Sequence, residues 1–153
     1  MGYLITIAGI FLGELFLKNH IEEKKTFQDR EEIAGGKIII SKFHNTGACL
    51  NLGNKKQKLV AFVSVLFTIL MMGVFLVTLT THGNHTMKLG LALLLGGAFS
   101  NTYDRLKRKY VVDYVSFKTP WKKLNGIIFN ISDFMIAIGA MMSAVAVIMN
   151  PNI

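Results

Sequence analysis

The stretch LVAFVSVLFTILMMGVFLVTLTT, residues 59–81, contains no charged side chain. A helix of about 20 apolar residues crosses the hydrocarbon core of a bilayer, because each residue advances it by about 1.5 Å. This stretch is therefore long enough to span a membrane, and it decides the fold class. We expect a transmembrane helix over about residues 58–81.

Three further apolar segments flank this one. Residues 3–17 carry no charge except at Glu14, residues 88–103 are uncharged after Lys88, and residues 124–149 carry no charge except at Asp133. The sequence thus predicts an all-α polytopic membrane protein, with a single domain over residues 1–153. Its four transmembrane helices are expected at about residues 3–20, 58–81, 88–105 and 124–149.

Two long connections, at about residues 21–57 and 106–123, carry the remaining structure. In the first, Gly35-Gly36 predicts a turn, and the β-branched residues 37–43 that follow predict a strand or hairpin. In the second, Trp121 stands beside Lys122 and Lys123. Because Trp and Lys are favoured at the membrane–water boundary, these residues predict a short interfacial segment.

Composition agrees with a membrane protein. Hydrophobic residues make up 52% of the chain and charged residues only 17%, against about 25% in soluble proteins. The formal net charge of +8 is compatible with nucleic acid or with an anionic membrane surface. The apolar content favours the membrane, and we expect no nucleic-acid partner. Cys49 is the single cysteine, so no intramolecular disulfide can form.

The positive charges are distributed unevenly. Of the 17 Lys and Arg residues, all but Lys88 lie on or near the two long connections. The positive-inside rule alone would place both connections in the cytoplasm. With four helices, both termini would then lie on the opposite side.

Polar residues at membrane depth are expensive and suggest function. Glu14 and Lys18 are four residues apart, so they share a helix face and can pair. Asp133 must be protonated, paired or exposed to a wet cleft, since an unpaired buried charge is costly. Asp113, in a loop returning toward the membrane, could be its partner. Two close carboxylates share a proton, as in aspartic proteases.

Other assignments remain open for these residues. Asp133 could instead cap or bond a neighbouring helix, and Asp104 is expected to form a structural ion pair with Arg105. A small transporter that uses Asp133 as a proton relay would also explain an acid within a helix. A thiol site of Cys49 and His44 is possible by residue type, although nothing orients that pair. We expect no metal site, because the histidines fall on both sides of the membrane; they are His20, His44, His82 and His85.

Four blocks, in this order, carry a resemblance to a known family. They are FHNTGA (43–48), GGAFSNTYDRL (96–106), VVDYV (111–115) and FNISD (129–133). With them the chain resembles lipoprotein signal peptidase (signal peptidase II), a membrane aspartic endopeptidase that cleaves prolipoproteins. The match runs over nearly the whole length.

The resemblance implies a catalytic dyad of Asp113 and Asp133 near the extracytoplasmic face of a bacterial cell membrane. It also implies that the strand region acts as an extracytoplasmic cradle that clamps the substrate. The expected substrate is a signal peptide helix followed by a diacylglyceryl-modified cysteine, cut just before that cysteine. No metal, cofactor or covalent intermediate is implied, and the partners are substrate and membrane lipid, with the protein a monomer. Supporting and substrate-binding roles fall to Asn45, Gly47, Asn101, Arg105, Asn130, Lys18 and Glu14.

The chain departs from the family pattern at several positions. Glu14 stands where aspartate is usual and is followed by Leu15 rather than glutamine. Ser132 replaces alanine, and Phe134 stands where a small residue is common. Residues 49–51 also differ from the usual continuation. These changes suggest a divergent paralogue with a restricted set of substrates. The alternative is a non-catalytic four-helix membrane protein that binds lipidated peptides or a partner complex.

The resemblance and the charge bias disagree about topology. The family places both long connections outside the cytoplasm and both termini inside. We expect the family topology, because the long connections are partly folded and part of their charge then need not act as a simple topogenic signal.

Overall fold

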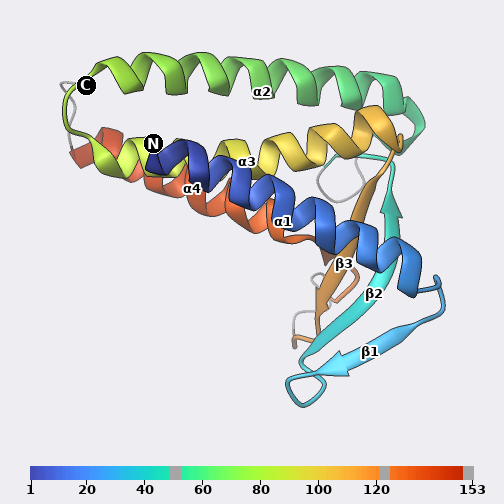
Figure 1. Cartoon of the computed structure of the whole chain (residues 1–153). Coiled ribbons are helices and arrows are strands. Elements are labelled where there is room, and N and C mark those ends of the chain that lie inside the picture. Colours follow the sequence, from blue (N-terminus) through green and yellow to red (C-terminus); the bar gives the residue numbers. More distant parts are fainter. Residues whose placement is uncertain (49–52, 121–124, 150–153) are drawn as a thin grey trace.

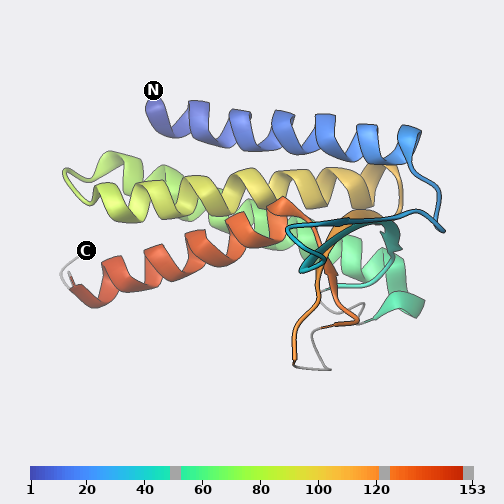
Figure 2. The same ribbon diagram turned by 90° about the horizontal axis from the view of Figure 1, so that it is seen from below.

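The computed structural model describes residues 1–48, 53–120 and 125–149, and Figure 1 shows the arrangement of its elements. Long helices lie side by side, and a small sheet projects from the end opposite the N-terminus and the C-terminal end of α4 (Figures 1 and 2). The helices are α1 (Gly2–Lys24), the 3-10 turn η2 (Asn54–Lys56), α2 (Gln57–Thr80), α3 (His85–Lys107) and α4 (Ile131–Met149). The strands are β1 (Arg30–Ile33), β2 (Ile38–Asn45), β3 (Val111–Phe117) and β4 (Ile128–Phe129).

Helix α3 is the centre of the bundle. It packs against α1, α2 and α4, and it contributes most of the buried side chains of the helical region. Leu91, Ala92 and Leu95 form an apolar core with Ile7 of α1 and Phe75 of α2. The first three helices lie within a few residues of the predicted bounds.

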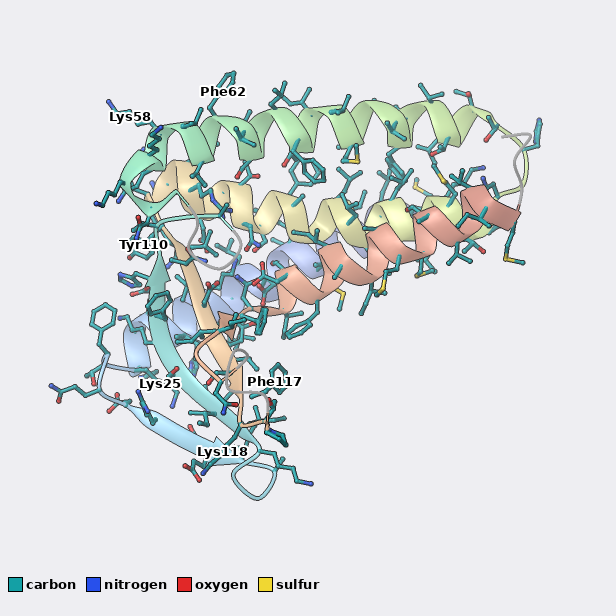
Figure 3. The ribbon with its side chains drawn as sticks, turned by 180° about the vertical axis from the view of Figure 1, so that it is seen from behind. Lys25, Lys58, Phe62, Tyr110, Phe117 and Lys118 are labelled. Atoms are coloured by element: carbon teal, nitrogen blue, oxygen red, sulfur yellow. The ribbon has the colours of Figure 1, made fainter. Side chains whose placement is uncertain are left out.

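Among the described residues, three helical segments are long and apolar enough to cross a membrane: Gly2–Lys24, Asn54–Thr80 and Ile131–Met149. Their outward faces carry large apolar side chains, such as Phe62 of α2, which points away from the other helices (Figure 3). Helix α3 carries more polar residues, because most of its surface faces neighbouring helices rather than lipid. The prediction of membrane helices is thus supported for three segments, and a fourth crossing by α3 stays a prediction.

The sheet is antiparallel throughout, with the strand order β1-β2-β3-β4. The β1–β2 hairpin turns at Gly35 and Gly36, whose φ angles of 66° and 78° suit glycine. The predicted hairpin is therefore confirmed. The prediction that Asp113 lies in a loop was wrong, since it lies in β3 opposite Phe43 of β2. A pairing between segments about 70 residues apart cannot be recognised from either segment alone.

The fourth helix was predicted to begin near residue 124, and it begins at Ile131. Residues 128 and 129 are extended instead, because they pair with Ser116 and Val115 of β3. Asp133 therefore lies in the first turn of α4 and not two turns inside a helix. The predicted interfacial Trp121, Lys122 and Lys123, together with Leu124 and Cys49-Leu50-Asn51, lie outside the described residues.

Helices α3 and α4 meet through glycines. A Cβ added to Gly139 of α4 would lie 2.4 Å from the carbonyl oxygen of Gly90, and one added to Gly97 would lie 2.4 Å from that of Ser132. Both neighbours are backbone atoms that cannot rotate away. Small residues of this kind let membrane helices approach closely.

We predict that Gly139→Ala destabilises the bundle by about 1–3 kcal/mol, because the added methyl group must separate α3 from α4. Gly73→Ala in α2 is the matched control, since a Cβ there meets nothing within 4 Å. Denaturant titration of helicity in micelles would measure both changes. Equal stability of the two variants would contradict the close packing of α3 on α4.

Candidate active site

Asp113 and Asp133 line one cavity of about 470 Å³. Asp113 reaches it from β3, and Asp133 reaches it from the first turn of α4. Helices α2 and α3, the end of β2, strand β4 and further residues of α4 supply the remaining walls. The other lining residues are Asn45, Ala48, Ser64, Phe67, Thr68, Ala98, Asn101, Thr102, Arg105, Val111, Ile127, Ile128, Phe129, Phe134, Ile136 and Ala137.

Each carboxylate oxygen of Asp113 accepts a hydrogen bond from an asparagine. The Nδ2 of Asn45 donates to Oδ2 at 2.9 Å, and the Nδ2 of Asn130 donates to Oδ1 at 2.6 Å. The residue is 1% exposed, so these amides replace water as its partners. The structure thus brings together three of the residues that the sequence singled out.

Asp133 is held in the same way. The Nδ2 of Asn101 donates to its Oδ1 at 2.8 Å, and the backbone N–H of Asn130 donates to its Oδ2 at 3.1 Å. In return, the Oδ1 of Asn130 accepts from the backbone N–H of Asp133 at 3.0 Å. This reciprocal pair is a capping box at the start of α4. Asn130 therefore contacts both carboxylates, one through its side chain and one through its backbone.

The environment of Asp113 favours its protonated form. Burial, followed by the negative charge of Asp133, raises the pKa of Asp113 to about 7, whereas the hydrogen bonds from Asn45 and Asn130 act in the opposite direction. A carboxyl group with this pKa can carry a proton at neutral pH and can also release it. Such a group suits proton transfer during a reaction.

Lys18 orients Asn101. Its Nζ donates to the Oδ1 of Asn101 at 2.8 Å and to the hydroxyl of Ser100 at 2.9 Å. With the amide oxygen facing a lysine, the amide nitrogen of Asn101 must face the other way, toward Asp133. Lys18 also pairs with Asp104 at 3.1 Å and, as predicted, with Glu14 at 3.6 Å.

Asp104 forms ion pairs, although not with the predicted partner. Its carboxylate contacts Lys18 and, at 2.9 Å, the Nε of Arg108. Consecutive residues of a helix point about 100° apart, so Asp104 and Arg105 face different neighbours. Arg105 turns to the cavity and donates to the carbonyl oxygens of Gly47, at 3.0 Å, and Asn101, at 3.3 Å.

Glu14 of α1 supports the start of α4 through hydrogen bonds to Ser132. Its Oε2 accepts from the backbone N–H of Ser132 at 3.1 Å and from the Ser132 hydroxyl at 2.8 Å. Its Oε1 accepts a short hydrogen bond from the hydroxyl of Tyr114. That hydroxyl in turn accepts from the backbone N–H of Ile131 at 3.2 Å. Two departures from the family pattern, Glu14 and Ser132, therefore contact each other directly.

The sequence reasoning missed several members of this network. Tyr114 follows Asp113 in β3 and so points to the opposite face of the strand, where it meets α1. A tyrosine beside an aspartate carries no signal of that contact. Ser100 was missed for the same reason, and so were three hydroxyl side chains that line the cavity, those of Ser64, Thr68 and Thr102. Their positions depend on which face of a helix is turned toward the site.

Within the described parts of the chain, no three His, Cys, Asp or Glu side chains gather in a way that could hold a metal ion. His44 lies 2.6 Å from Glu22 and stacks on Tyr110. Cys49, its proposed thiol partner, lies outside the described residues.

Comparison with known proteins now identifies the family. A family model described as signal peptidase (SPase) II matches residues 6–149. A lipoprotein signal peptidase of Mesorhizobium japonicum is 30% identical over 142 residues, which cover 90% of this chain and 79% of that protein. A lipoprotein signal peptidase of Listeria monocytogenes is 27% identical over 147 residues, covering 95% of this chain and 91% of that protein.

Two solved structures of bacterial membrane enzymes share the fold. One has a TM-score of 0.83 at 20% identity and covers 99% of this chain and 90% of that one. The other has a TM-score of 0.79 at 21% identity, covering 97% and 94%. The fold and the spanning helices define a multi-pass bacterial membrane protein. The sequence comparisons give a more specific assignment: the chain belongs to the signal peptidase II family of proteases.

Proposed function

We propose that this chain removes the signal peptide from diacylglyceryl-modified prolipoproteins, cleaving just before the lipidated cysteine, with Asp113 and Asp133 as an aspartic dyad. Residues 1–153 act as one membrane peptidase domain. The observation that carries the dyad is that both carboxylates line one cavity and are joined by Asn130, which contacts each of them. Membership of the signal peptidase II family supports the assignment of a prolipoprotein as the substrate.

The chemistry follows from a single proton shared by the two carboxylates. The ionised carboxylate accepts a proton from a water molecule, whose oxygen forms a bond with the carbonyl carbon of the scissile peptide. The protonated carboxylate donates its proton to the carbonyl oxygen. The tetrahedral intermediate then collapses: the C–N bond breaks, the departing amine takes up the proton that the first carboxylate gained from water, and a hydroxyl proton of the intermediate returns to the second carboxylate. The two carboxylates titrate as a pair, and their amide hydrogen bonds hold them in place throughout.

The walls of the cavity support an apolar substrate that arrives from the bilayer. Phe67 of α2 and Ile136 and Ala137 of α4 supply apolar contacts on either side of Asp133. Both helices pack on α3, and the cavity lies between them. A signal peptide helix in the membrane would reach the carboxylates along this wall without leaving the hydrocarbon region. Arg105, Asn45 and Gly47 would bind the peptide backbone at the polar end.

The proposed topology places the sheet and the dyad at the extracytoplasmic face, with α3 as a fourth membrane crossing. The N-terminus and the C-terminal end of α4 lie at the opposite end of the bundle from the sheet (Figure 1), so both termini would be cytoplasmic. We expect a reporter fused to the C-terminus to be active only if it is one that works in the cytoplasm. An extracytoplasmic C-terminus would overturn the proposal, because the substrate is lipidated on the outer face.

Asp113→Asn and Asp133→Asn are each expected to lower the cleavage rate by roughly 10²–10⁴-fold, because each removes one proton-transfer group. The substitutions keep the shape of the side chain, but the NH2 group that replaces one oxygen cannot accept a hydrogen bond, so each variant loses one of its two accepted bonds. Circular dichroism checks that the helices remain folded. A gel-shift assay with a diacylglyceryl-modified precursor measures the rate, with and without a known inhibitor of the family. Asp29→Asn, at an exposed position near β1, is the matched control.

Normal processing by either dyad variant would refute the aspartic mechanism. Binding of the precursor by the unmodified protein, without any cleavage, would instead favour a non-catalytic lipopeptide-binding protein.

The cleavage rate should also depend on pH. A dyad needs one protonated and one ionised carboxylate, and the pKa of Asp113 is raised to about 7. Below that value the shared proton is retained, and above it both carboxylates become ionised. We therefore expect the rate to fall as the pH rises through about 7. A pH–rate profile of the precursor cleavage measures this, and a rate that stays constant up to pH 9 would contradict the shared proton.

A further inference from the structure

Helix α1 carries three charged side chains at intervals of four residues: Glu14, Lys18 and Glu22. Residues at this spacing share one helix face. Glu14 holds the start of α4, and Lys18 orients Asn101 toward Asp133. We propose that Glu22 is the third member of this series, a positioning residue that sets strand β2 so that Asn45 meets Asp113. This inference rests on the proposed role of Asp113.

Glu22 ties α1 to two side chains of β2. Its Oε2 lies 2.8 Å from the Nζ of Lys42, which also donates to the backbone carbonyl of Glu22 at 2.9 Å. Its Oε1 lies 2.6 Å from the Nε2 of His44. The side chains of Glu22 and Lys42 are only 18% and 11% exposed, so solvent screens this contact less than it would an open surface pair.

The contact falls at an irregularity of the sheet. Ile40 pairs with Val115, and Phe43 pairs with Asp113, so three steps along β2 match two steps along β3. This is a β-bulge, in which one extra residue enters one strand. Two residues of β2, Ser41 and Lys42, take the place of one residue of β3.

The bulge decides which face of the sheet carries Asn45. With the bulge, Asn45 pairs with Val111, two residues from Asp113 and therefore on the same face. Without it, the pairing of Ile40 with Val115 would continue unbroken and would place His44 opposite Val111. Asn45 would then point to the other face, because a shift of one residue reverses every side chain. The hydrogen bond from Asn45 to Asp113 thus depends on the bulge.

The partners of Glu22 hold the bulge from the face of β2 that is turned toward α1 and away from the cavity. Lys42 and His44 are two residues apart and share the face toward α1, while Asn45 lies on the face toward the cavity. The ring of His44 stacks on Tyr110 with centroids 3.7 Å apart, near the junction of α3 with the sheet (Figure 3). Because Lys42 and His44 are both held on one face, β2 has little freedom to shift its register against β3. The amide of Asn45 is thereby fixed on the other face.

The test compares Glu22→Gln with Glu23→Gln, an exposed neighbour that loses the same charge. We expect Glu22→Gln to lower kcat for the lipidated precursor by about tenfold with KM unchanged, because small misplacements of reacting groups slow the chemical step. The declining limb of the pH profile should move to higher pH, since the hydrogen bond from Asn45 lowers the pKa of Asp113. Glu22→Asp, which keeps the charge, should restore part of the rate.

A double-mutant cycle makes the assignment specific. In the Asn45→Ala background, Glu22→Gln should cause little further loss, because both substitutions remove the same contact. An equal loss in both backgrounds, or a lower thermal stability without a change in kcat or in the pH profile, would overturn the proposal. Should Glu22→Gln fail to fold, His44→Gln takes its place in the cycle: it loses the ring contacts of His44 but leaves the pair of Glu22 with Lys42 intact.

One readout is independent of cleavage. Carbon NMR of Asp113 in micelles reports the titration of its carboxyl group, which should move to higher pH in Glu22→Gln and stay unchanged in Glu23→Gln. If the unmodified protein fails to cleave the precursor, the proposed function fails, while this titration still tests Glu22. An unchanged titration in Glu22→Gln would refute the positioning role alone.

Discussion

The start of α4 is the constraint on which the site depends. A helix that begins inside the protein leaves backbone N–H groups without partners in the helix, and in an apolar setting each is costly to leave unpaired. Here the N–H groups of four consecutive residues, Asn130, Ile131, Ser132 and Asp133, donate to the side chains of Asp133, Tyr114, Glu14 and Asn130 respectively. Asp133 is therefore both a cap of α4 and a member of the proposed dyad.

Helix α1 connects this cap to the rest of the site. Three of its charged side chains hold the start of α4, the amide of Asn101 and the bulge of β2, and none of the three lies among the residues that line the cavity in the described part of the chain. Buried charges of this kind contribute little to stability once desolvation is counted. Their value here is geometric, because each contact permits only one placement of the group it holds.

The sequence predicted many residues of the candidate site, but fewer of the residues that hold them in position. Asp113, Asp133 and the asparagines could be found because polar residues stand out in apolar segments and occur in ordered blocks. Glu14 and Lys18 could be paired because helical spacing is a local property. The role of Tyr114 and the ion pair of Asp104 with Lys18 could not, since both depend on contacts between segments far apart in the chain. The late start of α4 was missed because residues 127–129 are apolar and continue the pattern of the helix that follows, although two of them pair with β3.

The contact between Glu14 and Ser132 changes how the divergence of this chain is understood. The extra methylene of a glutamate lengthens its reach beyond that of an aspartate, and the serine hydroxyl supplies the atom that its carboxylate meets at 2.8 Å. Two of the departures from the family pattern therefore meet in one contact at the start of α4. Phe134, by contrast, lines the cavity next to the carboxylates. Glu14 and Ser132 do not line this cavity in the described part of the chain, whereas Phe134 does. A restricted range of substrates would therefore follow from Phe134 rather than from the contact of Glu14 with Ser132.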